Sequence, residues 1–172
     1  MKAWWFDNNG GKLRYGDGRI IRAGRTLKVK GDLELCRHGL HGSDRLLDAL
    51  KYARSSILWR VDLGGEILHG DDKACAAERT HLWKMDIEDI LRDFARRCAL
   101  DVVHLWDAPD LVVRFLKTGD ESLRDAARDA ARDAVARAAA WAARDAAWAA
   151  GDAAWAAAWD DQNKRLTAMV VR

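Results

Sequence analysis

The sequence predicts an α+β protein, in which a small, mixed β-rich domain is followed by helices. Three observations lead to this prediction. Residues 1–85 contain short apolar runs and apolar–polar alternation between glycine-rich turns, which is typical of strands. Residues 86–118 place apolar side chains at helical spacing, so we expect helices packed on that domain. Residues 120–160 are rich in alanine, the strongest helix former. Residues 161–172 remain as a tail, of which residues 166–171 are expected to pack back as a strand or short helix.

Strands are expected at several segments of the β-rich domain, with one helix between them. Residues 57–63 form the clearest strand, which Gly64 and Gly65 should stop before residues 66–69 resume it. The other expected strands are 4–6, 13–15 paired with 20–21, 27–30, 33–36 and 80–85.

Helix boundaries can be read from capping residues. Ser43 or Asp44 can cap the helix within the β-rich domain, because apolar residues at helical spacing follow. Asp86 is expected to cap the first helix of the next segment. Pro109 suits the first turn of a shorter helix, and Gly119 is its expected C-terminal cap.

The alanine-rich segment, residues 120–160, contains 20 alanines in 41 positions, and Asp120 can cap it. As one helix it would be about 60 Å long, more than the diameter of about 35 Å expected for the rest of the chain. Four tryptophans would expose about 600–1,000 Å² of side-chain surface, which a monomer rarely leaves in water. We therefore expect a homo-oligomer through this segment, with folding back at Gly151 as the alternative. The interface tryptophans are Trp141, Trp148, Trp155 and Trp159.

Composition and charge limit the function classes. The chain has 172 residues, of which 49% are hydrophobic and 33% charged, which excludes collagen-like and wholly disordered chains. It has no long uncharged apolar stretch and no signal-peptide core, and its three cysteines do not form a disulfide framework, so we expect a cytoplasmic protein with no membrane partner.

The net charge of +2 is unevenly distributed along the chain. Residues 1–60 hold 13 Lys/Arg and 6 Asp/Glu, a local charge of +7, and residues 61–172 hold 16 and 21, a local charge of −5. A basic first third can attract an anionic partner such as a nucleotide or phosphate, although a scattered, solvated basic surface is the alternative. We do not expect a nucleic acid as partner.

The densest polar cluster is residues 36–43, Cys-Arg-His-Gly-Leu-His-Gly-Ser, at a transition from strand to helix. An anion site would use backbone N–H groups of a helix N-terminus that opens at Ser43, with the side chains of Arg37, His38 and His41 nearby. These four residues are the predicted ligand-binding residues, with no metal and no cofactor.

Other interpretations of residues 36–43 stay open. Cys36 and the two histidines, with Cys75 as a fourth ligand, could bind zinc, although their spacing matches no closed zinc site. A cysteine or serine nucleophile beside a histidine is conceivable, but no orienting acid is identifiable. The cluster could also be purely structural, with its glycines serving the turn. Nearby, residues 71–73, Asp-Asp-Lys, could bind a metal or sugar hydroxyls, or form a polar turn between strands.

The chain resembles a domain of unknown function that is widespread in phages and bacteria. Its hallmark, Cys-x-x-Gly-(Phe/Leu)-His followed by Leu-Asp, is matched by Cys36, Gly39, Leu40 and His41 and by residues 47–48. Residues 96–101 and 104–109 look like a longer subgroup that ends in Ala/Trp/Arg/Asp repeats. The resemblance implies a phage-type protein and brings no established activity.

A weaker similarity is to ADP-ribosyltransferase-like folds, on residues 49–53 and 61–65. The sequence lacks the Glu-x-Glu pair of that pattern and offers only Glu78 nearby, so the similarity implies a retained nucleotide pocket rather than transferase activity. If the protein is such an enzyme, or one that cleaves nucleotides, the resemblance implies His41, Ser43 and Glu78 as its catalytic residues.

Taken together, these observations predict a non-enzymatic, oligomeric phage-type protein that captures an anionic, nucleotide-like small molecule, in a role against host defence. The enzyme just described is one alternative. A structural protein whose function is self-assembly through residues 120–160 is the other.

Overall fold

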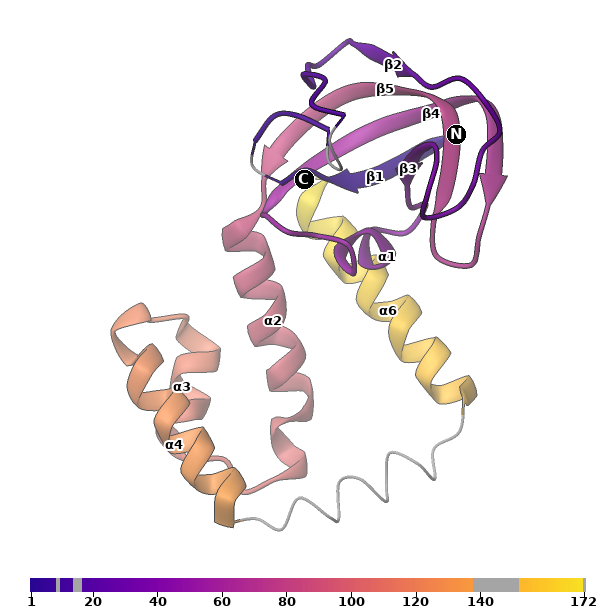
Figure 1. Cartoon of the computed structure of the whole chain (residues 1–172). Helices are drawn as coiled ribbons and strands as arrows, with labels where there is room; N and C mark the ends of the chain where they lie inside the picture. Colours follow the sequence, from indigo (N-terminus) through magenta and orange to yellow (C-terminus); the bar gives the residue numbers. More distant parts are fainter. Residues whose placement is uncertain (9, 14–16, 138–151, 172) are drawn as a thin grey trace. The chain divides into compact units, whose positions relative to one another are not determined.

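The computed structural model describes residues 1–8, 10–13, 17–137 and 152–171, which fall into two compact units (Figure 1). The first unit consists of Met1–Glu88 and Met169–Arg172, and the second of Asp89–Ala168. An antiparallel sheet dominates the first unit and helices make up the second, so the α+β prediction is confirmed.

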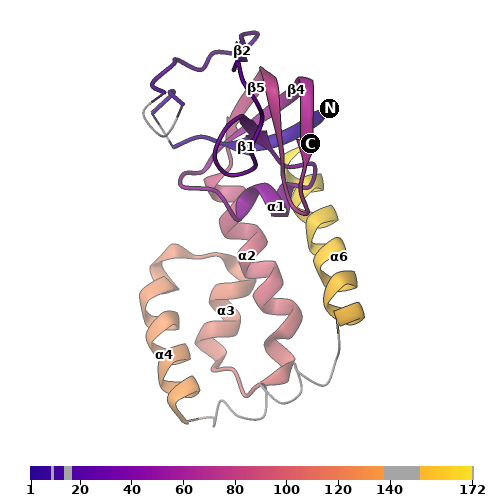
Figure 2. The same cartoon turned by 45° about the vertical axis from the view of Figure 1, so that its right-hand side comes forward.

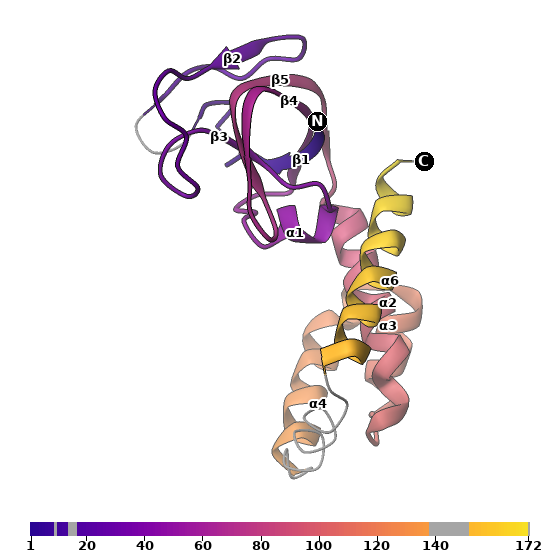
Figure 3. The same cartoon turned by 90° about the vertical axis from the view of Figure 1, so that its right-hand side faces the viewer.

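The sheet of the first unit has the strand order β1-β4-β5-β2, and β3 also pairs with β5. Every pairing is antiparallel. Figures 2 and 3 show β4 and β5 running together as a curved hairpin, and the short helix α1 lies close to β1. The elements are β1 (Lys2–Phe6), β2 (Thr26–Lys28), β3 (Leu40–Gly42), α1 (Leu46–Leu50), β4 (Ile57–His69) and β5 (Ala74–Asp86).

Two strand predictions are wrong at their ends. The predicted stop at Gly64 and Gly65 is absent, because β4 continues through both residues with a shift in register against β5. Gly65 has a φ of +68°, a left-handed conformation that only glycine adopts without strain, and such a residue makes a bulge rather than a break. The last strand begins at Ala74 rather than at the predicted residue 80.

The strand predicted at residues 33–36 is also wrong, because these residues enter a tight turn. Glu34 and His38 exchange two backbone hydrogen bonds of 2.8 Å, and Cys36 between them has a φ of +69°. A non-glycine residue in this region marks a local constraint that apolar–polar alternation does not reveal.

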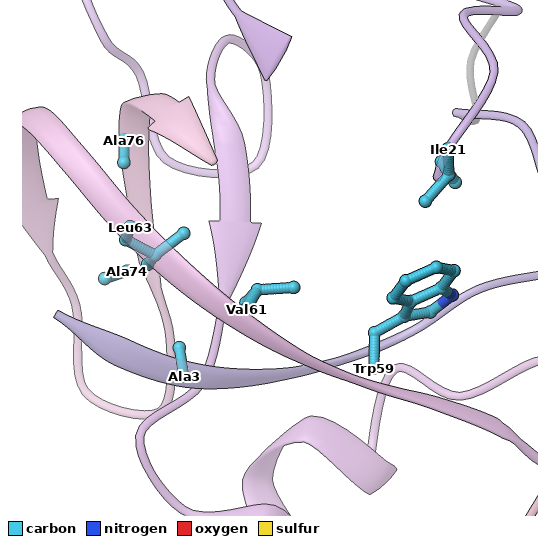
Figure 4. Close-up of a cluster of buried hydrophobic side chains, with 7 residues drawn as sticks. All are labelled: Ala3, Ile21, Trp59, Val61, Leu63, Ala74 and Ala76. Carbon is cyan, nitrogen blue, oxygen red and sulfur yellow. The ribbon is translucent and has the colours of Figure 1, made fainter. Parts of the chain in front are cut away.

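The sheet packs its core on one face, where alternate side chains of β4 meet small residues of its neighbours (Figure 4). Ile21, from the chain before β2, lies over Trp59 and closes one end of the cluster. The alanines let the strands curve closely around the larger β4 residues. The buried cluster consists of Ala3, Ile21, Trp59, Val61, Leu63, Ala74 and Ala76.

The helical segments of the second unit follow the predicted capping residues. Asp86 Oδ1 accepts the N–H of Glu88 at 3.1 Å as α2 begins, and Gly119 ends α3 with a φ of +66°. Asp120 accepts the N–H of Ser122 at 3.0 Å, and α3 packs on α4. The helices are α2 (Glu88–Val102), α3 (Asp110–Thr118), α4 (Arg124–Arg137) and α6 (Asp152–Val170).

The described parts of the alanine-rich segment are helical, and α6 continues past residue 160 to Val170. Trp141 and Trp148 lie outside the described residues. Trp155 lies in α6, of which only the backbone is described at that position, and Trp159 is half-buried. None of the helices in the described ranges combines the length and apolar character needed to cross a membrane.

A buried histidine makes the stability of the first unit depend on pH. His81 is fully buried, with the rings of Trp5 and Trp59 at 5.8 and 5.2 Å in edge-to-face contact. Burial, and then the charge of Arg79, lower the pKa of His81 to about 4. The neutral form is therefore favoured in the folded state, and the stability it contributes is present above pH 6.5 and lost as pH falls towards 4.

We predict that the free energy of unfolding decreases by about 2 kcal/mol between pH 7 and pH 5 because of His81 alone. Urea unfolding followed by tryptophan fluorescence at both pH values measures this. His81→Phe should reduce the total decrease by about this amount, whereas the matched variant at an exposed site, His69→Phe, should retain it in full. An equal decrease in wild type and His81→Phe would show that another group is responsible.

Candidate functional site

The first unit contains a cavity of about 460 Å³, here called the first cavity. The four predicted ligand-binding residues, Arg37, His38, His41 and Ser43, all line it. Its other lining residues are Trp4, Trp5, Phe6, Leu13, Asp17, Val29, Cys36, Gly39, Leu40, Gly42, Ala49, Tyr52, Lys73 and Arg79.

Two glycines allow the segment 36–43 to lie against the sheet. A Cβ atom at Gly39 would lie 3.0 Å from Cys75 Cβ of β5, and Gly39 has a φ of +132°. A Cβ atom at Gly42 would lie 3.0 Å from Ala3 Cβ of β1. The glycines of the sequence motif are therefore required by close approach on both sides, and this approach places the residues between them at the cavity.

His41 connects the two ends of this segment. Its Nε2 accepts the backbone N–H of Cys36 at 3.1 Å, which requires the neutral ring. Burial, and then the charges of Lys73 and Arg79, lower the pKa of His41, so the neutral ring dominates at pH 7. His38 is more exposed, and its Nε2 lies 2.9 Å from the carbonyl oxygen of Lys30.

The helix N-terminus expected at Ser43 is not formed. Ser43 is buried and bridges to β1, because its N–H donates to Trp4 O at 2.9 Å and its carbonyl accepts the Trp4 N–H at 2.7 Å. The helix α1 begins only at Leu46, with Arg45 before it. Capping by Ser43 or Asp44 is therefore wrong, and backbone groups of a helix end do not make the anion site predicted there.

Two of the cations that line the cavity lie over aromatic rings. The guanidinium of Arg79 lies 4.0 Å from the centre of the Trp5 ring, and its Nη1 donates to the carbonyl of His41 at 2.6 Å. Lys73 Nζ lies 4.2 Å from the centre of the Tyr52 ring. Arg79 is only 2% exposed, so its charge lies at the floor of the site rather than in bulk water.

Sequence reasoning missed Arg79 and both rings as site residues, and it considered Lys73 only as part of the Asp-Asp-Lys segment. The two-residue spacing of strands could have indicated Arg79. Arg79 lies two residues before His81 on β5, so both side chains lie on the buried face of the strand. A charged residue at such a position is rarely buried without a specific role.

The acidic residues do not support the predicted catalytic set. Among the described residues that line the cavity, Asp17 has the only carboxylate, and it is paired with Arg19 at 2.6 Å. A hydrogen bond from Arg19 lowers the pKa of Asp17. Glu78 immediately precedes Arg79 on β5, so its side chain points to the other face of the strand and does not line the cavity. It is paired there with Lys28 Nζ at 2.6 Å. The three residues His41, Ser43 and Glu78 are therefore not assembled.

The fold does not support the interpretation of residues 36–43 as a zinc site. Within the described ranges, no three His, Cys, Asp or Glu side chains are placed to hold a metal ion together. Cys36, Cys75 and Cys98 are all free thiols.

The comparisons with known proteins agree with one part of the sequence resemblance. A family model described as a domain of unknown function, DUF7666, matches residues 15–93. The matched range begins before β2, ends within α2 and includes residues 36–43. No curated protein and no solved structure matches the chain.

We predict that Gly39→Ala destabilises the protein by about 2 kcal/mol or more, because the new Cβ meets Cys75 and the backbone there is left-handed. Gly64→Ala is the matched control on β4. The nearest atom to its added Cβ is 3.9 Å away, so its effect should stay below about 1 kcal/mol. Equal unfolding midpoints of the two variants in urea would contradict the required close approach.

Proposed function

We propose that the first cavity binds an anionic, nucleotide-like small molecule and releases it unchanged. The observation that carries the proposal is the pair of cations over aromatic rings, Arg79 on Trp5 and Lys73 on Tyr52, in one cavity. A nucleotide joins a phosphate to a planar heteroaromatic base, so it needs both kinds of group within one binding site. The volume of about 460 Å³ lies in the range of small-molecule sites.

The charge balance of the cavity favours an anion. Lys73 and Arg79 contribute positive charges, Arg37 is paired with Glu34 at 3.2 Å, and the carboxylate of Asp17 is held by Arg19. At an effective dielectric constant of about 20, a phosphate about 4 Å from one of these cations gains about 4 kcal/mol. The Arg79 contribution is the least screened by salt, because that guanidinium is buried.

The hydrogen bond of His41 and the ion pair of Glu78 favour binding of the ligand without its chemical conversion. The lone pair of His41 Nε2 already accepts the Cys36 N–H, so this nitrogen is not available as a general base. Glu78 lies on the opposite face of β5 and is paired with Lys28. No observation favours the transferase or nucleotide-cleaving alternative over binding.

We also propose that the chain self-associates through residues 120–160, from the tryptophan spacing in the sequence. An oligomeric binding protein of a phage could withdraw a nucleotide signal from host defence. In this proposal the cavity binds the ligand, and self-association through residues 120–160 increases the number of binding sites per oligomer.

Titration calorimetry with nucleoside diphosphates and with the corresponding nucleosides tests the binding proposal. We expect the diphosphates to bind at least ten times more tightly. Lys73→Met, which keeps the length of the side chain over Tyr52, should weaken diphosphate binding about tenfold, and the matched variant in the second unit, Lys117→Met, should leave it unchanged. Chromatography after denaturation should return intact ligand.

Other outcomes of these measurements favour the alternatives. Conversion of the ligand would support an enzyme. A melting temperature that no nucleotide and no inorganic phosphate raises would contradict the binding proposal and support a structural protein.

Light scattering of the full-length chain tests self-association. The wild type should show an oligomeric mass, and the combined replacement of Trp141, Trp148 and Trp155 with Ala should lower it, since each buried indole contributes up to about 4–6 kcal/mol by area. An Ala139→Ser, Ala143→Ser and Ala146→Ser variant, with three substitutions at positions that helical spacing puts opposite the tryptophans, is the control. A monomeric wild type would contradict the proposal.

A further inference from the structure

A second cavity of about 590 Å³ lies beside the first in the same unit. Cys36 and Lys73 line both cavities, so the two meet at this pair of residues. Residues 71–73, the Asp-Asp-Lys segment that connects β4 and β5, form part of the second cavity. Lys73 can therefore contact a molecule that extends from one cavity into the other.

The boundary between the cavities is held by a network of hydrogen bonds and ion pairs. The Tyr52 hydroxyl donates to the carboxylate of Asp72, with oxygen distances of 2.8 and 2.9 Å. Lys51 Nζ lies 3.0 Å from Asp48 and 3.5 Å from Asp72. Because Tyr52 also lies under Lys73, this network fixes the position of the lysine at the boundary.

The second cavity differs chemically from the first. Its cations, Arg45, Lys51 and Lys73, are balanced by three carboxylates, those of Asp48, Asp71 and Asp72. Asp48 and Asp72 are engaged by Lys51. Asp71 is exposed, and within the described ranges no hydrogen bond or ion pair joins it to another residue. A wall with balanced charges attracts a phosphate less than the first cavity does, whereas the Asp71 carboxylate accepts hydrogen bonds from hydroxyl groups.

We infer that the ligand is a nucleotide sugar, a nucleoside diphosphate that carries a second sugar on its terminal phosphate. Its base and phosphates occupy the first cavity, with a phosphate beside Lys73, and its second sugar enters the second cavity and donates hydroxyl hydrogen bonds to Asp71. A mononucleotide lacks the second sugar that this arrangement places in the second cavity. This inference rests on the proposed function and specifies the ligand class for that site.

Titration calorimetry with three matched pairs tests the inference: ADP and ADP-ribose, UDP and UDP-glucose, GDP and GDP-mannose. For the base that the site accepts, we expect the sugar conjugate to bind at least five times more tightly than the diphosphate, although it carries less negative charge. Asp71→Asn should remove this difference and leave diphosphate affinity unchanged or slightly higher. Asp32→Asn, the same change at an exposed aspartate that lines neither cavity, should behave as wild type.

The outcomes separate the two proposals. Equal affinities for diphosphate and conjugate in the wild type would overturn the nucleotide-sugar inference and leave the proposed function in place. An Asp71→Asn variant that binds both the diphosphate and the conjugate more weakly, by the same factor, would also overturn it. Asp71 would then contact the part that the two ligands share. If none of the six compounds binds, the proposed function itself fails.

Discussion

The architecture of the site depends on the close approach of residues 36–43 to two strands of the sheet. Positions 39 and 42 lie so near β5 and β1 that a side chain at either would meet another Cβ at 3.0 Å. This approach brings His41 into register with Cys75, and it places the His41 carbonyl where Arg79 donates to it at 2.6 Å. The backbone packing of this segment therefore helps to set the position of the buried cation.

A buried guanidinium is costly to desolvate, and the fold offsets this cost with several weaker interactions. The Trp5 ring lies 4.0 Å below it, the His41 carbonyl accepts a hydrogen bond, and its field contributes to the lowered pKa of Asp17. The same positive field contributes to the lowered pKa values of His41 and His81. Neutral imidazoles beside a fixed cation give a site that is positive without depending on protonation near pH 7.

Much of the framework could be predicted from the sequence, because local chemistry determines it. The strands β1, β2 and most of β4 follow apolar patterning, and Asp86 and Gly119 mark helix boundaries by capping. The cluster at residues 36–43 was predicted as a site because of its residue types, and the structure places Arg37, His38, His41 and Ser43 at one cavity.

The parts that could not be predicted depend on contacts between distant segments. The left-handed conformation of Cys36 has no local signal, since glycine would be the expected residue there, and it turns a predicted strand into a loop. The predicted helix N-terminus does not form at Ser43, because Ser43 pairs with Trp4, 39 residues away in sequence, before α1 begins. Glu78 and Arg79 are neighbours on β5 and point to opposite faces of the strand. Glu78, a predicted catalytic residue, faces away from the cavity, whereas Arg79, which the sequence analysis did not select, lines it. Strand register decides which of the two residues faces the cavity, and register depends on the pairing of the whole sheet. The cation-rich cavity could therefore be recognised only once β5 was paired with β3 and β4.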